Sequence, residues 1–155
     1  MGLSSRRVLE WSILAIVVLV LMGIFGRQVQ IVQGQAELAT IKSTLGSIRT
    51  AFVLDHLKQQ IDGNARNVAS GQRNPFLLLK STPANYVGQP VKGELQLGSW
   101  MFDAECVCIA YTPVHSQFLE NASADPTLWF RISPPPGPFM VTPTERYVWA
   151  GEVLQ

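Results

Sequence analysis

The chain begins with its longest apolar stretch. Arg6 and Arg7 are followed by a run from Val8 to Gly26 in which Glu10 is the only charged residue. A run of this length with basic residues before it predicts a membrane-spanning helix. A carboxylate in such a helix costs about 2.5–3.5 kcal/mol near the bilayer centre and less toward its end, so Glu10 is a candidate functional residue. The alternative is that Glu10 lies at the headgroup level, with Arg7 as its partner.

A second apolar pattern follows the first, at the spacing of an α-helix. Its members recur every three or four residues and are Leu38, Ile41, Leu45, Ile48 and Phe52. This spacing places them on one helix face, which we assign to helix–helix packing. The first proline of the chain is Pro75, and residues 28–62 are rich in helix formers. One helix over residues 6–62 is therefore predicted, about 85 Å long by the rise per residue of an α-helix, with its second half outside the membrane.

The far end of this helix has a second apolar face. Leu54, Leu57 and Ile61 repeat at helical spacing on roughly the opposite side. Two apolar faces require two partners, and we expect the chain's own domain to cover one and a neighbouring molecule to contact the other. The alternative is a break near Phe52 into two shorter helices. Gly63 is placed to take the left-handed conformation that ends a helix.

Beyond residue 63 the pattern changes to short apolar runs separated by turn residues. Segments 100–102 and 106–111, around a turn at 103–105, predict a hairpin. Residues 128–132 predict a third strand, and 146–150 form a candidate fourth. The proline-rich stretch 133–138 cannot donate to a sheet and is expected to be a loop. We therefore predict an α+β fold, in which a long N-terminal helix with a membrane-spanning first half packs against a small antiparallel β-sheet.

Composition excludes several classes of function. A net charge of +1 gives no general attraction to nucleic acid, so no nucleic-acid partner is expected. His56 and His115 are isolated, with no second histidine at ligand spacing, so neither a metal nor a cofactor is expected. The chain has no glycine-rich phosphate loop and no nucleophile elbow, and nothing indicates catalysis. Trp100, Trp129 and Trp149 are expected to lie in the core of the sheet.

Cys106 and Cys108 are the only cysteines. Two cysteines are too few for a disulfide framework or a structural zinc site. On a regular strand both side chains would point to the same side, a poor arrangement for an unstrained disulfide. We expect two free thiols buried in the core, and the alternatives are a local bridge or a bond to a partner.

Three interpretations of the N-terminus compete. A cleaved secretory signal would need a small-x-small site, and Gly26-Arg27-Gln28-Val29 after the apolar run provides none. A plain signal anchor is the second possibility. The third is a prepilin-type signal, which is cut before the apolar stretch and leaves that stretch attached. In every case Arg6 and Arg7 hold the start of the chain in the cytoplasm, and the body is exported.

The order of these features resembles the type IV pilin-like proteins, which include the minor pilins of type IV pili and the pseudopilins of type II secretion. A short leader precedes an apolar helix with Glu10 near its start, and an amphipathic helix continues through Gln35–Glu37 and Thr44–Ala51. The connector and first hairpin look like those of pseudopilins at Asn74-Pro75, Pro83–Tyr86 and Gly98–Tyr111.

The resemblance implies an assembly role for the N-terminus. In the family, prepilin peptidase removes the leader, and a glutamate near the start of the mature chain meets the free amino group of a neighbouring subunit. Aligning Glu10 with that glutamate places the cut between Ser5 and Arg6, where the family has a glycine and an apolar residue. A charge that is unfavourable in lipid then becomes paired on docking, which couples membrane extraction to filament packing.

These expectations divide the chain into a leader at 1–5, a transmembrane half-helix at 6–26, a soluble half-helix at 27–62 and a periplasmic domain at 63–155. The function implied is that of a non-enzymatic minor pilin or pseudopilin, single-pass in a bacterial inner membrane with its N-terminus cytoplasmic. The partners implied are other pilin or pseudopilin subunits, an inner-membrane assembly platform and prepilin peptidase. The alternatives are an uncleaved, anchored scaffold for the same machinery and an anchored ligand-binding domain.

Overall fold

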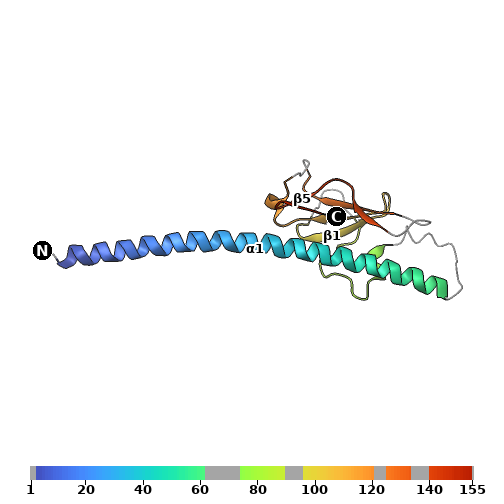
Figure 1. Cartoon of the computed structure of the whole chain (residues 1–155), viewed down its shortest axis with the longest axis horizontal. Helices are drawn as coiled ribbons and strands as arrows, with labels where there is room; N and C mark the ends of the chain where they lie inside the picture. Colours follow the sequence, from blue (N-terminus) through green and yellow to red (C-terminus); the bar gives the residue numbers. More distant parts are fainter. Residues whose placement is uncertain (1–2, 62–73, 90–95, 121–124, 134–139, 155) are drawn as a thin grey trace. The chain divides into compact units, whose positions relative to one another are not determined.

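The structure is a computed structural model that describes residues 3–61, 74–89, 96–120, 125–133 and 140–154 (Figure 1). Its internal contacts divide the chain into two units, Met1–Ala36 and Glu37–Gln155. Helix α1 (Leu3–Ile61) contributes to both units. Each unit is described by itself below.

Helix α1 is continuous over 59 residues. The predicted helix over residues 6–62 is therefore confirmed, and the alternative of a break near Phe52 is wrong. No proline interrupts the backbone hydrogen bonds over this range, and the glycines at 23, 26 and 46 are tolerated within it. The expected cap at Gly63 lies outside the described residues.

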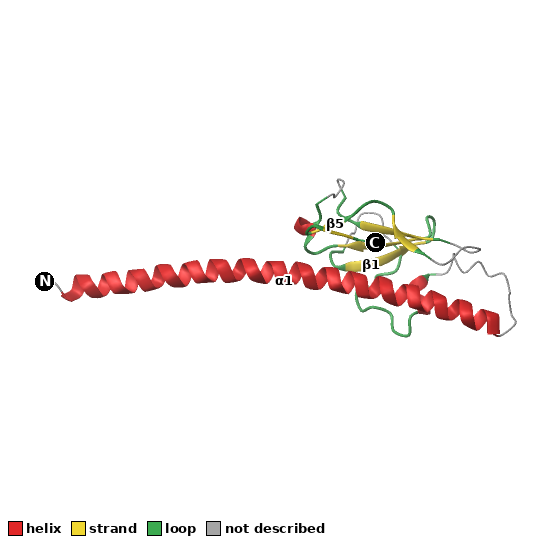
Figure 2. Cartoon of the chain, in the orientation of Figure 1, coloured by secondary structure: helices red, strands yellow, loops and turns green. Residues whose placement is uncertain are grey.

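The second unit contains a four-stranded antiparallel sheet in the order β1-β2-β3-β4 (Figure 2). Its strands are β1 (Ser99–Asp103), β2 (Cys108–Thr112), β3 (Leu128–Ile132) and β4 (Val141–Pro143). A separate two-stranded ladder joins β5 (Val148–Trp149) to β6 (Glu152–Val153). The α+β prediction is confirmed, because the second part of α1 packs on the four-stranded sheet.

The predicted hairpin and third strand are confirmed, with two corrections. Residues 146–150 contain the short strand β5, which pairs with β6 and not with the main sheet. The fourth strand of the main sheet is instead β4, whose Pro143 pairs with Phe130. Sequence patterning missed β4 because it follows a proline-rich stretch and itself contains a proline. An edge strand tolerates that residue, since one side of its backbone needs no partner.

The core lies between α1 and one face of the sheet. Side chains alternate along β3, where Leu128, Phe130 and Ile132 are buried while Trp129 and Arg131 are not. The inward-facing residues join the apolar stripe of α1 in one cluster, which includes Leu38, Ile41, Leu45, Ile48, Phe52, Trp100, Phe102, Ile109, Tyr111, Leu128, Phe130 and Ile132. Strands with period-two burial against a helical stripe are what an α+β layer requires.

A short connector closes the end of this core. The 3-10 helix η2 (Pro75–Leu78) is capped by Asn74, whose side-chain oxygen accepts a hydrogen bond from the Phe76 backbone N–H at 3.0 Å. Phe76 is fully buried and stacks on Tyr86, with ring centroids 4.3 Å apart. Tyr86 in turn bridges to Trp100 of β1. The connector is therefore part of the folded domain.

Candidate functional site

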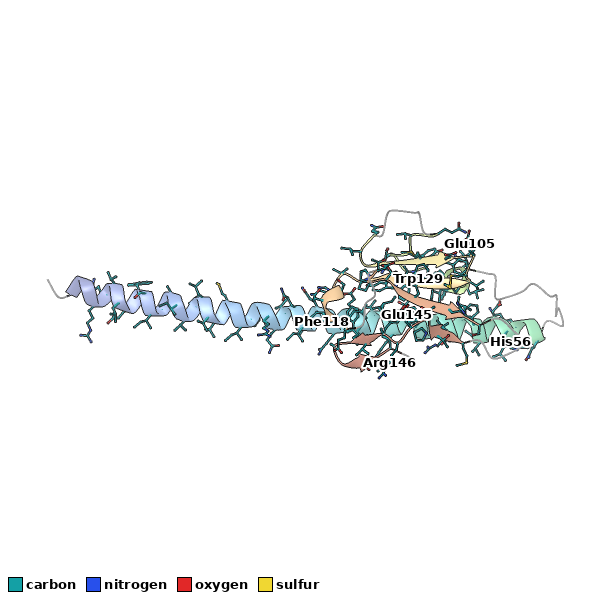
Figure 3. All side chains as sticks on the ribbon, turned by 90° about the horizontal axis from the view of Figure 1, so that it is seen from above. His56, Glu105, Phe118, Trp129, Glu145 and Arg146 are labelled. Carbon is teal, nitrogen blue, oxygen red and sulfur yellow. A yellow bond between two sulfur atoms is a disulfide. The ribbon has the colours of Figure 1, made fainter. Side chains whose placement is uncertain are left out.

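The first unit presents an apolar surface with no cover from the described chain. Helix α1 contains an 18-residue window of mean hydropathy 2.6, and none of that window is buried. Figure 3 shows the side chains of this part of the helix projecting on all sides. Length and composition make it one candidate membrane span. It matches the apolar run identified in the sequence.

Glu10 is paired within its own helix. Its carboxylate lies 3.7 Å from the Arg6 side chain, one helical turn before it, and both side chains are largely exposed. Arg7, the partner considered from the sequence, is not the residue that contacts it. The structure therefore brings Glu10 and Arg6 together, while the Ser5 side chain lies outside what it describes.

The apolar stripe assigned to helix–helix packing has a different partner. Leu38, Ile41, Leu45, Ile48 and Phe52 are all buried in the core that α1 forms with the sheet of its own domain. They are not free to contact another helix, and the assignment is corrected accordingly. The reason is that a helical stripe specifies only that something apolar covers it, and here the chain's own strands do so.

The second apolar face of α1 is exposed. Leu54, Leu57 and Ile61 keep 54%, 47% and 82% of their surface, and Val53 beside them keeps 53%. In the described chain the face borders an open groove of about 1010 Å³, lined by α1 from Ser43 to Lys58 and by residues 78–83. The hydroxyl groups of Thr44, Ser47 and Thr50 in this groove donate to carbonyl oxygens of the same helix. They are held by the helix and are not arranged as nucleophiles.

A buried carboxylate that the sequence analysis did not single out holds the start of the second unit together. Glu37 is 9% exposed. Its Oε1 accepts hydrogen bonds from the Tyr111 hydroxyl at 2.9 Å and from the Val114 N–H at 2.7 Å. Its Oε2 accepts from the His115 N–H at 3.0 Å and lies 2.7 Å from His115 Nδ1. Both oxygens are thus satisfied by the end of β2 and the loop after it.

This arrangement explains the one strong change in acidity in the described chain. Burial raises the pKa of Tyr111 well above its ordinary value, and the hydrogen bond and negative charge of Glu37 raise the pKa further. His115 is therefore not isolated, as the sequence indicated, because it pairs with Glu37. Nothing in the sequence links these residues, which are 74 to 78 positions apart. A single polar residue beside Leu38 at the edge of an apolar helical face was the only signal.

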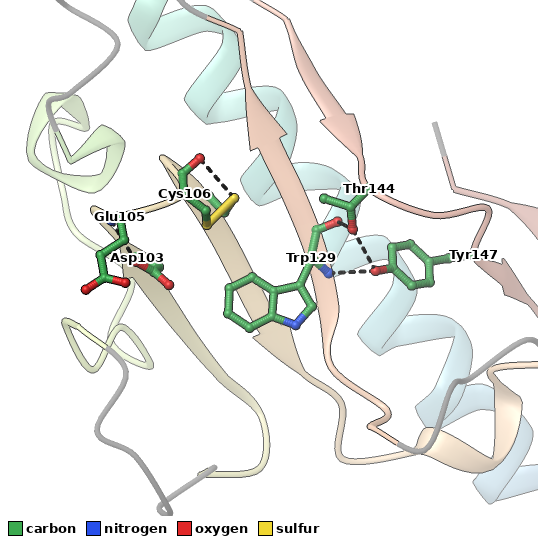
Figure 4. Close-up of a disulfide and its surroundings, with 7 residues drawn as sticks. Asp103, Glu105, Cys106, Trp129, Thr144 and Tyr147 are labelled. Carbon is green, nitrogen blue, oxygen red and sulfur yellow. Dashed lines mark hydrogen bonds between the residues drawn. A yellow bond between two sulfur atoms is a disulfide. The ribbon is translucent and has the colours of Figure 1, made fainter.

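The cysteines form a disulfide, Cys106–Cys108, at the turn between β1 and β2 (Figure 4). The prediction of two buried free thiols is wrong. Cys106 lies in the turn and is exposed, while Cys108 opens β2 and is buried. The strand does not extend back to Cys106, so the same-side geometry assumed for a regular strand does not apply. The left-handed backbone of Val107, at φ 56°, turns the two side chains toward each other.

The other candidate residues have ordinary surroundings. Trp100 and Trp149 are fully buried, as predicted, but Trp129 is only half-buried and lies on the other face of β3. His56 is exposed on α1 and contacts Gln60 at 3.0 Å (Figure 3). Within the described ranges, no group of three or more His, Cys, Asp or Glu side chains is close enough to hold a metal ion.

Comparison with known proteins gives no further assignment. No family model matches this chain, no curated protein matches it, and no solved structure matches it. The long N-terminal apolar helix with its small antiparallel sheet is compatible with a pilin-like shape.

Proposed function

We propose that the protein is a non-enzymatic structural subunit, a minor pilin or pseudopilin, of a type IV pilus or type II secretion filament. The observation that supports this most is an uncovered apolar helical segment with one carboxylate in its first turns, continuous in the chain with a folded α+β domain. The apolar segment would lie in a bacterial inner membrane and the domain in the periplasm. Other subunits, an assembly platform and a prepilin peptidase would be its partners.

Glu10 has the central role in this proposal. An ionised carboxylate is unfavourable in hydrocarbon, and an exposed pair with Arg6 at 3.7 Å is only a weak compensation. A positive amino terminus from a neighbouring subunit would add a second, closer cation as the subunits leave the lipid. The gain from pairing a buried charge then favours assembly over the free, membrane-embedded subunit.

A substitution at Glu10 tests the role. We expect Glu10→Ala to abolish co-purification with filament partners after mild detergent extraction, while membrane insertion is kept. Ser12→Ala is the matched control, because Ser12 lies in the same turn region and its hydroxyl only donates to the Leu9 carbonyl at 2.9 Å. Undiminished co-purification of Glu10→Ala would overturn the assembly role.

The second candidate function is an uncleaved, membrane-anchored scaffold for the same machinery. One observation favours it: Glu10 already has a cation, Arg6, within its own helix. Mass spectrometry of the native N-terminus separates the two. A mature chain that starts at Arg6 supports the filament subunit, and an intact Met1 supports the scaffold.

A further inference from the structure

The Cys106–Cys108 disulfide closes a ring around a single residue. The two Cα atoms are 5.2 Å apart, and the sequence separation is 2. A disulfide stabilises a fold mainly by restricting the unfolded chain, and this effect grows with the length of the closed loop. A bridge over one residue joins no two elements of the sheet and gives the smallest effect of this kind. Structural stapling is therefore a poor explanation for it.

The residue inside the ring is in an unfavourable conformation. Val107 has φ 56°, in the left-handed region that β-branched residues avoid. It is held there from outside the ring, because its carbonyl accepts a hydrogen bond from the Ile132 N–H at 3.2 Å and its side chain packs against the core. Opening the disulfide removes one of the constraints that keep Val107 in this conformation.

The two sulfur atoms have different surroundings. Cys106 is exposed, whereas Cys108 is 3% exposed. Cys108 Sγ lies 3.2 Å from the Cys106 carbonyl oxygen, so a thiol at position 108 has an acceptor already in place. Cys108 pairs in register with Arg131 on one side and with Asp103 on the other. A cation is thus placed on the strand beside the buried sulfur, together with a carboxylate.

We propose that Cys106–Cys108 is a redox-active pair that exchanges with the thiols of a dithiol. A thiolate of the dithiol attacks the exposed Sγ of Cys106, the S–S bond breaks, and Cys108 leaves as a thiolate that takes up a proton. The second thiol of the dithiol then attacks its own partner sulfur and releases Cys106, which is protonated in turn. The dithiol becomes a disulfide, and the protein pair gains two electrons and two protons. This proposal is independent of the filament role.

Redox titration of the full-length protein tests the exchange. The protein, in mild detergent, is equilibrated with mixtures of reduced and oxidised glutathione, quenched with acid, alkylated and weighed by mass spectrometry. We expect reversible conversion between the disulfide and dithiol forms while tryptophan fluorescence stays that of the folded domain. Structural disulfides resist the glutathione pool. A pair that stays oxidised until the domain is unfolded, or that never closes in oxidised glutathione, would overturn the proposal.

Single substitutions test the direction of attack. Cys108→Ser leaves the exposed sulfur and Cys106→Ser leaves the buried one, so each variant is the control of the other. We expect Cys108→Ser to form a mixed disulfide with oxidised glutathione at least about tenfold faster than Cys106→Ser. Equal or reversed rates would show that Cys106 is not the attacked sulfur.

The strain at position 107 gives an independent readout. Asparagine tolerates the left-handed conformation better than valine does, so Val107→Asn should shift the glutathione equilibrium toward the disulfide by about fivefold. The wild-type pair is the reference, and the loss of valine packing affects both redox forms. An unchanged equilibrium would show that the conformation of Val107 does not favour opening.

Discussion

The Glu37 cluster gives the sharpest test of how α1 is joined to the sheet. Its carboxylate accepts hydrogen bonds from Tyr111, Val114 and His115, and it is 9% exposed. Glu37→Gln keeps the size of the side chain and replaces one oxygen with an NH₂ group. That group faces N–H or O–H donors whichever way the amide is turned, so the contacts made by one oxygen are lost.

The expected effect follows from those contacts. Each carboxylate oxygen takes part in two of the four contacts, at 2.7 and 2.9 Å for Oε1 and at 2.7 and 3.0 Å for Oε2. Hydrogen bonds to a charged group contribute about 1.5–3 kcal/mol each, and the donors left behind are poorly placed to reach water. We expect Glu37→Gln to lower the free energy of unfolding by about 3–5 kcal/mol.

Urea unfolding of the full-length protein in mild detergent measures this, with fluorescence of the buried tryptophans Trp100 and Trp149 as the signal. Lys42→Met is the matched control, since Lys42 also joins α1 to the sheet region, through Glu152, but both side chains of that ion pair are about half exposed. Exposed pairs contribute less than about 1 kcal/mol. A loss below about 1 kcal/mol for Glu37→Gln, comparable to that of the control, would refute the reasoning.

Two further predictions concern the same domain. Because burial and Glu37 raise the pKa of Tyr111, the folded state keeps that proton after the unfolded state has lost it. The resulting stability is present below about pH 10 and is lost as the pH rises beyond it, so wild type should lose more unfolding free energy than Tyr111→Phe between about pH 9 and pH 11. Equal losses would contradict this. Gly98 and Gly88 both have positive φ, but a Cβ at Gly98 would meet Val114 Cγ2 at 2.9 Å while one at Gly88 meets nothing within 4 Å. Gly88→Ala should cost about 1–2 kcal/mol in urea unfolding and Gly98→Ala more, and equal costs would show that the contact with Val114 is relieved.

Much of the fold was readable from the sequence because it depends on local periodicity. The apolar run, the helical stripe from Leu38 to Phe52 and the alternation in Leu128–Ile132 each express the repeat of one element, and each element formed where its pattern predicted. The same patterns did not identify what covers each face. The stripe expected to meet another helix is covered by the chain's own sheet.

Tertiary structure alone decided the contacts between distant segments. The register that brings Tyr111 and the loop after β2 to Glu37 connects residues 74 to 78 positions apart, and no local repeat encodes such a pairing. Strand β4 exists because β3 offers it a free edge, although its proline argues against a strand. The disulfide likewise depends on where β2 begins and on the turn at Val107. The sequence by itself determined which segments are helical, extended or apolar, because those properties depend on near neighbours, whereas partners depend on how the whole domain packs.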